Sequence, residues 1–281
     1  MKTAVSSYSF GPYQKSLGNE GIMKKAKEMG FDGIEFIDSH IASLDEAKAL
    51  RALAKELDIE ICAFCVGADL ANNDASAEIA KLKSKVDIAE ALGTPLMRHD
   101  VTWGVGSGAK VGISYDALIP KIIPAIREVT EYAKARGIRT LTENHGRFSQ
   151  DADRVEKLIN EVNNENFGAL VDVGNFMCAD EDPWKSVAKM MPYAYHVHVK
   201  DFFLKSGQEP NPGKGWFLTR GGDYLRGTIV GHGVARVYQS IATVKRSGYD
   251  GFVSIEFEGM EDNLKGIELG LENLKKVWDA V

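Results

Sequence analysis

Hydrophobic and polar positions along the chain repeat one arrangement from end to end. An amphipathic stretch leads into Gly or another turn residue, and a short run of apolar, β-rich sequence follows. The stretches KKAKEMGFDGIEFID and ATVKRSGYDGFVSIEF, near the two ends of the chain, share the order Gly, aromatic, Asp, Gly. Helix-period segments that alternate with strand-period segments are typical of βα units around a parallel sheet.

This alternation predicts eight strands and eight helices in strict order. We expect strands near 2–8, 33–37, 59–66, 95–99, 139–144, 168–173, 195–200 and 251–257. We expect helices near 19–29, 44–57, 76–92, 115–136, 151–162, 184–190, 234–246 and 262–279. The pattern favours an α/β fold with a single (β/α)8 TIM barrel over a doubly wound sheet, because SSYSFGPYQKS lacks a Gly-rich phosphate turn. No linker divides the chain, so we expect one domain, 1–281.

The longest stretch without periodicity, residues 201–233, follows the seventh predicted strand. In a barrel, the loops that follow the strands build the face that carries the active site. Loops of this length are more often functional or mobile than idle. We therefore expect this loop to border a site.

Composition and charge argue against several classes of protein. No stretch approaches the ~20 apolar residues of a membrane span. The first residues, MKTAVSSYSFGPY, lack the apolar core of a signal peptide, so we expect a cytoplasmic protein without a membrane partner. The net charge is −6 and the basic residues are dispersed, which disfavours nucleic acid as a partner. Three cysteines are too few for a disulfide scaffold, and we expect Cys62 and Cys65 to be structural, on opposite faces of a strand.

The stretch YHVHVKD, residues 195–201, places ionisable side chains at alternate positions with valines between them. In a barrel strand, alternate side chains face the interior and the others face the helices. Because the helix-facing side must be apolar, Val197 and Val199 are expected to point outward. His196, His198 and Lys200 then point inward, toward the mouth where barrel enzymes keep their chemistry.

The same test on neighbouring strands delivers carboxylates to that mouth. It places Asp172, Glu256 and Glu143 inward at strand ends, with His145 one step beyond Glu143. A single buried His or strand-end Glu is usually core or a surface ion pair, but together these groups would repel strongly unless a cation held them. We therefore expect one divalent metal ion, Mn²⁺ first and Mg²⁺, Co²⁺ or Zn²⁺ as alternatives, held by Glu143, Asp172, His198 and Glu256.

These residues lie in motifs that resemble the sugar phosphate isomerase/epimerase family, the xylose isomerase-like TIM barrels. The resemblance covers essentially the whole chain and is most specific in TENHG, LVDVGN, HVHVKD, GHGVARV and GYDGFVSIEFEG. It implies the same four metal ligands and a small-molecule sugar substrate. It also implies self-association into a homo-oligomer.

Two departures from the family pattern affect substrate binding. Many relatives have His three positions after the metal-binding Asp, where this chain has Asn175. The long insertion leaves Arg226 as the best candidate for a substrate-binding arginine. The expected substrate-binding residues are His145, Asn175, Arg226, Lys200 and His99.

The function that this pattern favours is a metal-dependent sugar or sugar phosphate isomerase or epimerase. We expect Glu143 and Glu256 to flank the sugar and move a proton next to its carbonyl through an enediolate, with His145 as a further base. The principal alternative is a lyase subunit that cleaves 3-keto-C-glycosides by β-elimination together with a smaller partner chain. A phosphodiester hydrolase like endonuclease IV needs more ligands and a basic groove, and a metal-free binding module needs the four-residue cluster to be coincidental.

Overall fold

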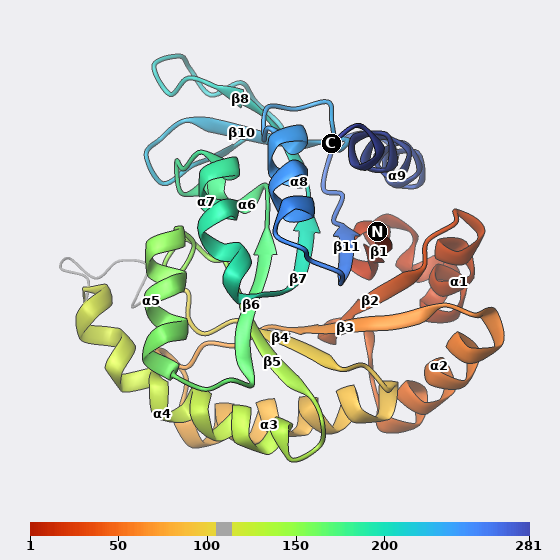
Figure 1. Cartoon of the computed structure of the whole chain (residues 1–281), viewed down its shortest axis with the longest axis vertical. Coiled ribbons are helices and arrows are strands. Elements are labelled where there is room, and N and C mark those ends of the chain that lie inside the picture. Colours follow the sequence, from red (N-terminus) through yellow and green to blue (C-terminus); the bar gives the residue numbers. More distant parts are fainter. Residues whose placement is uncertain (105–113) are drawn as a thin grey trace.

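The computed structural model describes residues 1–104 and 114–281. Within these residues, eight parallel strands close into a barrel in the order β1-β11-β7-β6-β5-β4-β3-β2, and helices surround it (Figure 1). The barrel strands are β1 Lys2–Ser6, β2 Gly33–Ile37, β3 Glu60–Val66, β4 Leu96–His99, β5 Arg139–Glu143, β6 Phe167–Asp172, β7 Ala194–Val199 and β11 Phe252–Ile255. The predicted TIM barrel is therefore confirmed.

The outer helices follow the strands as the sequence predicts. They are α1 Gln14–Glu28, α2 Leu44–Leu57, α3 Ala75–Leu92, α4 Tyr115–Lys134, α5 Ala152–Val162, α7 Pro183–Met190, α8 Val237–Arg246 and α9 Asn263–Ala280, with a short α6 Asn175–Cys178. Several begin at a residue whose side chain accepts a backbone N–H of the first turn: Ser43, Asp74, Ser114, Asp151 and Asp262. Short 3-10 turns lie at Ser7–Tyr13, Asp38–His40 and Met191–Tyr193.

The inward and outward faces of β7 agree with the alternation in the sequence. Val197 and Val199 are fully buried in the apolar layer between strands and helices. His196 and His198 lie in the barrel interior, where both bond to Glu35 of β2. On β5, the side chain of Thr140 faces the helices. Its hydroxyl lies 2.8 Å from the hydroxyl of Thr130 in α4, and this hydrogen bond gives both buried hydroxyls a partner.

One strand departs from simple alternation, and the expected placement of its cysteines is wrong. In the pairing of β2 with β3, Ile34 aligns with Ile61 but Glu35 aligns with Ala63, so Cys62 is an extra residue in a β-bulge. The bulge turns both Cys62 and Cys65 toward the interior, where each lies near Glu35. Both thiols are buried and free.

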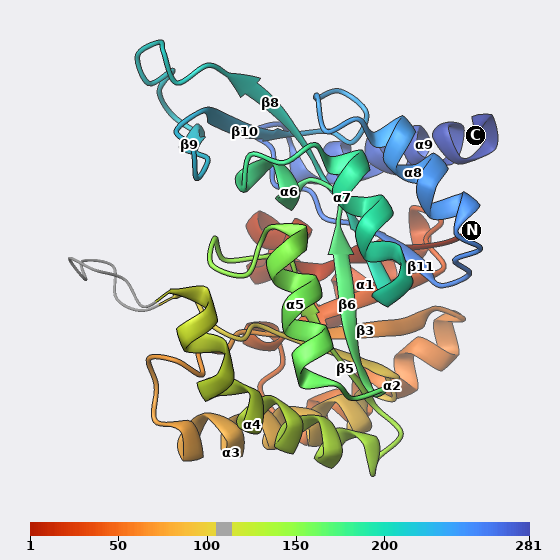
Figure 2. The same ribbon diagram turned by 60° about the vertical axis from the view of Figure 1, so that its left-hand side comes forward.

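The stretch after β7, expected to be a loop, contains a small antiparallel sheet of its own. Strand β8 (Asp201–Lys205) pairs with β10 (Tyr224–Thr228), which pairs with the short β9 (Phe217–Leu218). Figure 2 shows this sheet projecting beyond the barrel next to α6 and α7. The sequence does not predict this sheet, because its paired strands β8 and β10 are far apart along the chain and no short turn joins them.

A single carboxylate fastens the base of this sheet to the barrel. Asp201 is buried and accepts the backbone N–H groups of Phe202, Gly231, Gly233 and Ala235, each at 2.9 Å. A Cβ on Gly233 would lie 2.3 Å from the Asp201 carboxylate, so glycine is required there. The motif GHG therefore serves this contact.

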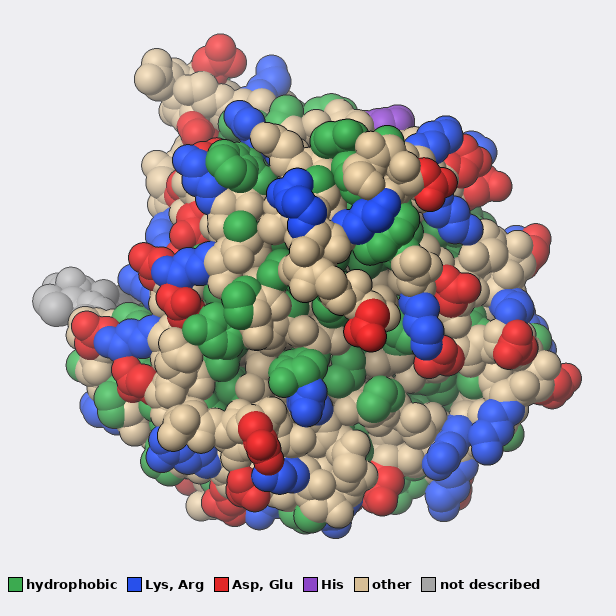
Figure 3. Space-filling view, viewed as in Figure 1, with side chains coloured by type: hydrophobic (Ala, Val, Ile, Leu, Met, Phe, Trp, Pro, Cys, Tyr) green, Lys and Arg blue, Asp and Glu red, His purple; other side chains and the backbone are tan. Residues whose placement is uncertain are grey.

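The described helices include none with the length and apolar character needed to cross a membrane. On the face drawn in Figure 3, Lys and Arg side chains are interspersed with Asp and Glu side chains and form no continuous basic band.

The Asp201 contact predicts a measurable stability effect. Replacing Asp201 with Ala removes the acceptor for four backbone N–H groups, two of them buried, so the free energy of unfolding should fall by about 3 kcal/mol in urea titrations. The control Asp250→Ala alters an exposed aspartate and should change stability by less than about 0.5 kcal/mol. Equal stability of the two variants would contradict this role of Asp201.

Candidate active site

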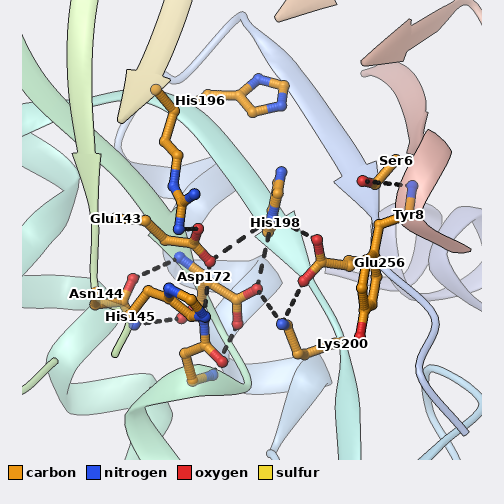
Figure 4. A network of polar contacts seen from close by, with 12 residues as sticks. Ser6, Tyr8, Glu143, Asn144, His145, Asp172, His196, His198, Lys200 and Glu256 are labelled. Atoms are coloured by element: carbon orange, nitrogen blue, oxygen red, sulfur yellow. Dashed lines mark hydrogen bonds and ion pairs between the residues drawn. The ribbon is translucent and has the colours of Figure 1, made fainter. Parts of the chain in front are cut away.

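The four expected ligands converge at the carboxyl end of the barrel. Glu143 ends β5, Asp172 ends β6, His198 lies near the end of β7, and Glu256 follows β11. One ligand atom from each of the four lies within 4.8 Å of the others. His198 Nδ1 is 3.9 Å from Glu143 Oε1, 3.7 Å from Asp172 Oδ2 and 3.8 Å from Glu256 Oε1 (Figure 4).

The donor set fits a divalent cation. His198 Nδ1 and Asp172 Oδ2 are buried and have no hydrogen-bond partner in the described chain. Unpaired buried polar atoms are costly, and here the imidazole nitrogen faces three carboxylates. Three carboxylate oxygens and one imidazole nitrogen suit Mn²⁺, Mg²⁺, Co²⁺ or Zn²⁺. These residues are the ones that would hold the ion.

Glu143 is held by donors on two sides. Arg98 Nη2 lies 2.7 Å from its Oε2 and also 2.8 Å from Asp100. Asn175 donates to its Oε1 at 2.8 Å. The guanidinium is buried between two carboxylates, so it offsets part of their mutual repulsion and fixes the direction of Glu143.

Lys200 serves the opposite side of the site. Its ammonium donates to Glu256 Oε2 and lies 3.5 Å from Asp172 Oδ2 and 3.4 Å from Glu258 Oε1. The lysine is almost fully buried, so this charge is available to the site and little screened by water. It is brought there by the inward face of YHVHVKD, as the alternation predicts.

Burial and neighbouring charges shift the pKa values of the site in different directions. Burial raises the pKa of Asp172 to about 7, against the opposing effect of Lys200. Burial lowers the pKa of His198, but the nearby Glu35 carboxylate outweighs it and brings the pKa to about 10. Burial also raises the pKa of Glu256, but Lys200 and His198 hold it below its ordinary value. The charge of each of these buried groups therefore depends on the charges of its neighbours.

Around these residues lies a polar pocket of about 180 Å³. Its wall includes Tyr8, Arg98, His145, Lys200 and Glu258. His145 Nδ1 lies 3.1 Å from Asp100 Oδ1, and its ring meets the edge of Trp103 at 4.9 Å. Burial lowers the pKa of His145, but the hydrogen bond to Asp100 raises it overall. A small pocket with many polar groups suits a small polyhydroxylated molecule.

Three of the expected substrate-binding residues have other contacts. Asn175 is buried and bonds to Glu143, so it supports a ligand rather than lining the pocket. His99 is fully buried, its Nδ1 lies 2.9 Å from the carbonyl of Asp100, and its ring packs near Phe167. Its neighbour Arg98 lines the pocket instead, because alternate residues of β4 face opposite sides.

Arg226 lies on β10, outside the pocket lining. Its guanidinium stacks over the rings of Phe203 and Trp216, at 5.0 and 5.4 Å from their centroids. The interaction is of the cation–π kind and stabilises the small sheet. The sequence could not show this because the sheet itself was not expected.

Two acidic residues of the site escaped the sequence analysis. Glu35 on β2 is fully buried and bonds to His196 and His198, and Glu258 lines the pocket beside Lys200. The alternation test, applied to GIEFI at 33–37, would have placed Glu35 inward between the outward Ile34 and Phe36. Glu258 has the same parity as Glu256, but it lies one residue beyond the strand expected at 251–257, so the test did not reach it.

Comparison with known proteins agrees with this architecture. An uncharacterised protein of Methanocaldococcus jannaschii is 24% identical over 302 aligned residues, covering 100% of this chain and 92% of that protein. Inosose dehydratase 1 of Bacillus cereus is 24% identical over 141 residues, 49% of this chain and 46% of that protein.

Solved structures with the same fold include enzymes that act on sugars. The xylose isomerase domain protein of Planctomyces limnophilus superposes with a TM-score of 0.78 at 19% identity, covering 100% of this chain and 98% of that one. The IOLI protein with a bound zinc atom gives 0.78 at 16% identity, over 100% and 99%. D-psicose 3-epimerase of Clostridium cellulolyticum, solved with D-tagatose, gives 0.75 at 15% identity, over 99% of both chains.

At these identities the structural likeness establishes the fold alone. The family model described as xylose isomerase-like TIM barrel matches residues 23–277. Because that match spans most of the sequence and the strands close into the same barrel, the chain belongs to the xylose isomerase-like TIM barrel family.

Proposed function

We propose that this protein is a metal-dependent sugar isomerase or epimerase that moves a proton next to a carbonyl. The observation that carries the proposal is the cluster of Glu143, Asp172, His198 and Glu256, whose ligand atoms lie within 4.8 Å of one another around an unpaired imidazole nitrogen. The epimerase among the structural neighbours supports the reaction class. Mn²⁺ is the metal we expect first, since three of the four donors are carboxylates.

When bound, a divalent ion polarises a substrate carbonyl and makes the neighbouring C–H more acidic. The protein's own groups then move the proton. Glu143 and Glu256 come from strands on either side of β7 and lie on opposite sides of His198 (Figure 4), so they would face a bound sugar from two directions. One carboxylate takes the proton and the other returns it, which changes the configuration at that carbon.

The other pocket residues orient and balance this pair. Arg98 fixes the direction of Glu143, and Lys200 donates to Glu256 and holds the pKa of that carboxyl below its ordinary value. His145, with its Nδ1 on Asp100, leaves Nε2 for a substrate hydroxyl or for a proton. The small polar pocket fits a sugar better than an apolar ligand.

A dehydratase is the second candidate, because Lys200 provides a buried ammonium beside Glu256 and Glu258. Elimination of water starts with the same proton abstraction and needs a group that protonates the departing hydroxyl. The similarity of half the chain to an inosose dehydratase supports this variant of the chemistry. Product mass separates the two candidates, since isomers keep the substrate mass and a dehydratase product has lost water.

Removal of one ligand should weaken metal binding strongly. Calorimetric titration with Mn²⁺ should give one site in the wild type, and Asp172→Asn should weaken binding by more than about 100-fold. The matched control Asp32→Asn removes an acceptor used by Thr3 at the other end of the barrel and should bind Mn²⁺ normally. Wild-type protein that binds no divalent ion would refute the metal site.

The proton transfer can be followed with Mn²⁺-loaded protein in D₂O. Deuterium should enter the carbon next to the carbonyl in one member of a panel of ketoses and inososes. Glu143→Gln, assayed at saturating Mn²⁺, should lower the rate by about 10²–10⁴-fold because the variant lacks a basic carboxylate. Glu60→Gln, an exposed glutamate paired with Lys2, is the control and should exchange normally. Near-normal exchange by Glu143→Gln would remove Glu143 from the mechanism.

A further inference from the structure

A buried carboxylate on the far side of His198 links two histidines of the same strand. Glu35 Oε2 lies 2.7 Å from Nε2 of His196 and 2.8 Å from Nε2 of His198. All three side chains are at most 2% exposed. Across the described residues, Glu35 forms ion pairs with these two imidazoles and with no lysine or arginine.

This arrangement fixes which nitrogen of His198 keeps its proton when the ring is neutral and binds a metal ion. A carboxylate only accepts hydrogen bonds, so the Nε2 atom that faces Glu35 must be the N–H donor. The other nitrogen, Nδ1, points at the carboxylates of Glu143, Asp172 and Glu256, and it is the nitrogen that gives up its proton and offers its lone pair when a metal ion binds. Nδ1 is also the atom of His198 that has no hydrogen-bond partner.

His196 has a different part in this contact. Its Nε2 donates to the same oxygen, while its Nδ1 lies in the interior without a partner. The two rings meet edge to face at 5.3 Å, at an angle of 74°. His196 therefore fixes Glu35, and Glu35 in turn fixes His198.

We propose that Glu35 is a positioning residue that holds His198 in the Nε2–H tautomer and so presents Nδ1 as a metal donor. The inference rests on the metal site of the proposed function. It assigns a role to a residue on β2, across the barrel from the ligand strands, that touches neither the ion nor the substrate. A carboxylate behind a ligating imidazole also raises the basicity of the ligand.

Glu35→Gln tests this role with little change of shape. The amide lacks the negative charge, and its oxygen can replace only one of the two carboxylate oxygens that lie 2.8 Å from His198 Nε2. The other position becomes an NH₂ group that faces the imidazole N–H, so the hold on the Nε2–H form is weakened. Mn²⁺ affinity measured by calorimetry should fall by about 10–100-fold. Glu78→Gln removes another buried carboxylate, one that serves Lys81, Asn73 and the Asp69 N–H, and should leave the affinity unchanged.

The tautomer itself can be read in the wild type, which keeps the test valid if Glu35→Gln does not fold. In Zn²⁺-loaded protein labelled with ¹⁵N-histidine, the His198 ring should show a protonated Nε2 and an unprotonated Nδ1. The signals are assigned by their absence from His198→Gln. A protonated Nδ1, or unchanged Mn²⁺ affinity in a folded Glu35→Gln, would overturn the role of Glu35 alone. Wild type that binds neither Mn²⁺ nor Zn²⁺ would overturn the proposed metal site and this inference with it.

Discussion

The mouth of this barrel depends on the balance of charge in a space that water hardly reaches. Carboxylates brought together in a low-dielectric interior repel one another, and each must be offset by a fixed donor or cation. Arg98 faces Glu143, and Lys200 faces Glu256 and Asp172. The strands carry these cations inward by the same alternation that carries the acids, so the balance is part of the barrel itself.

Much of the fold and the centre of the site could be predicted from the sequence, for one reason. A barrel strand exposes its two faces to different surroundings, and the sequence records that difference at every second residue. The alternation correctly placed His198, Lys200, Asp172 and Glu256 inside. Alternation predicts the direction of a side chain where the strand pairs regularly with its neighbours and where its outer face must be apolar.

The remaining features depend on events that alternation does not record. The bulge at Cys62 adds one residue to β3. Strict alternation would place Cys62 and Cys65 on opposite faces, but the added residue brings both to the inner face. In RHD, His99 is the expected substrate-binding residue, but alternation turns its side chain toward the helices, and Arg98 lines the pocket. The paired strands of the antiparallel sheet after β7 are separated by a long connecting segment, so no local sequence pattern predicts their pairing. These are consequences of pairing between distant segments.

The contact of Asp201 with the 231–235 segment has a consequence for how such a protein can vary. Asp201 lies where the segment 201–233 leaves the barrel, and residues 231–235 lie where the chain returns to it. The hydrogen bonds of the Asp201 carboxylate therefore hold the two ends of this segment together. With the two ends held, the entropic cost of a longer connection between β8 and β10 concerns only that connection, and it grows slowly with the number of residues. The tip of the small sheet can therefore change in length and sequence while the barrel beneath it keeps its structure.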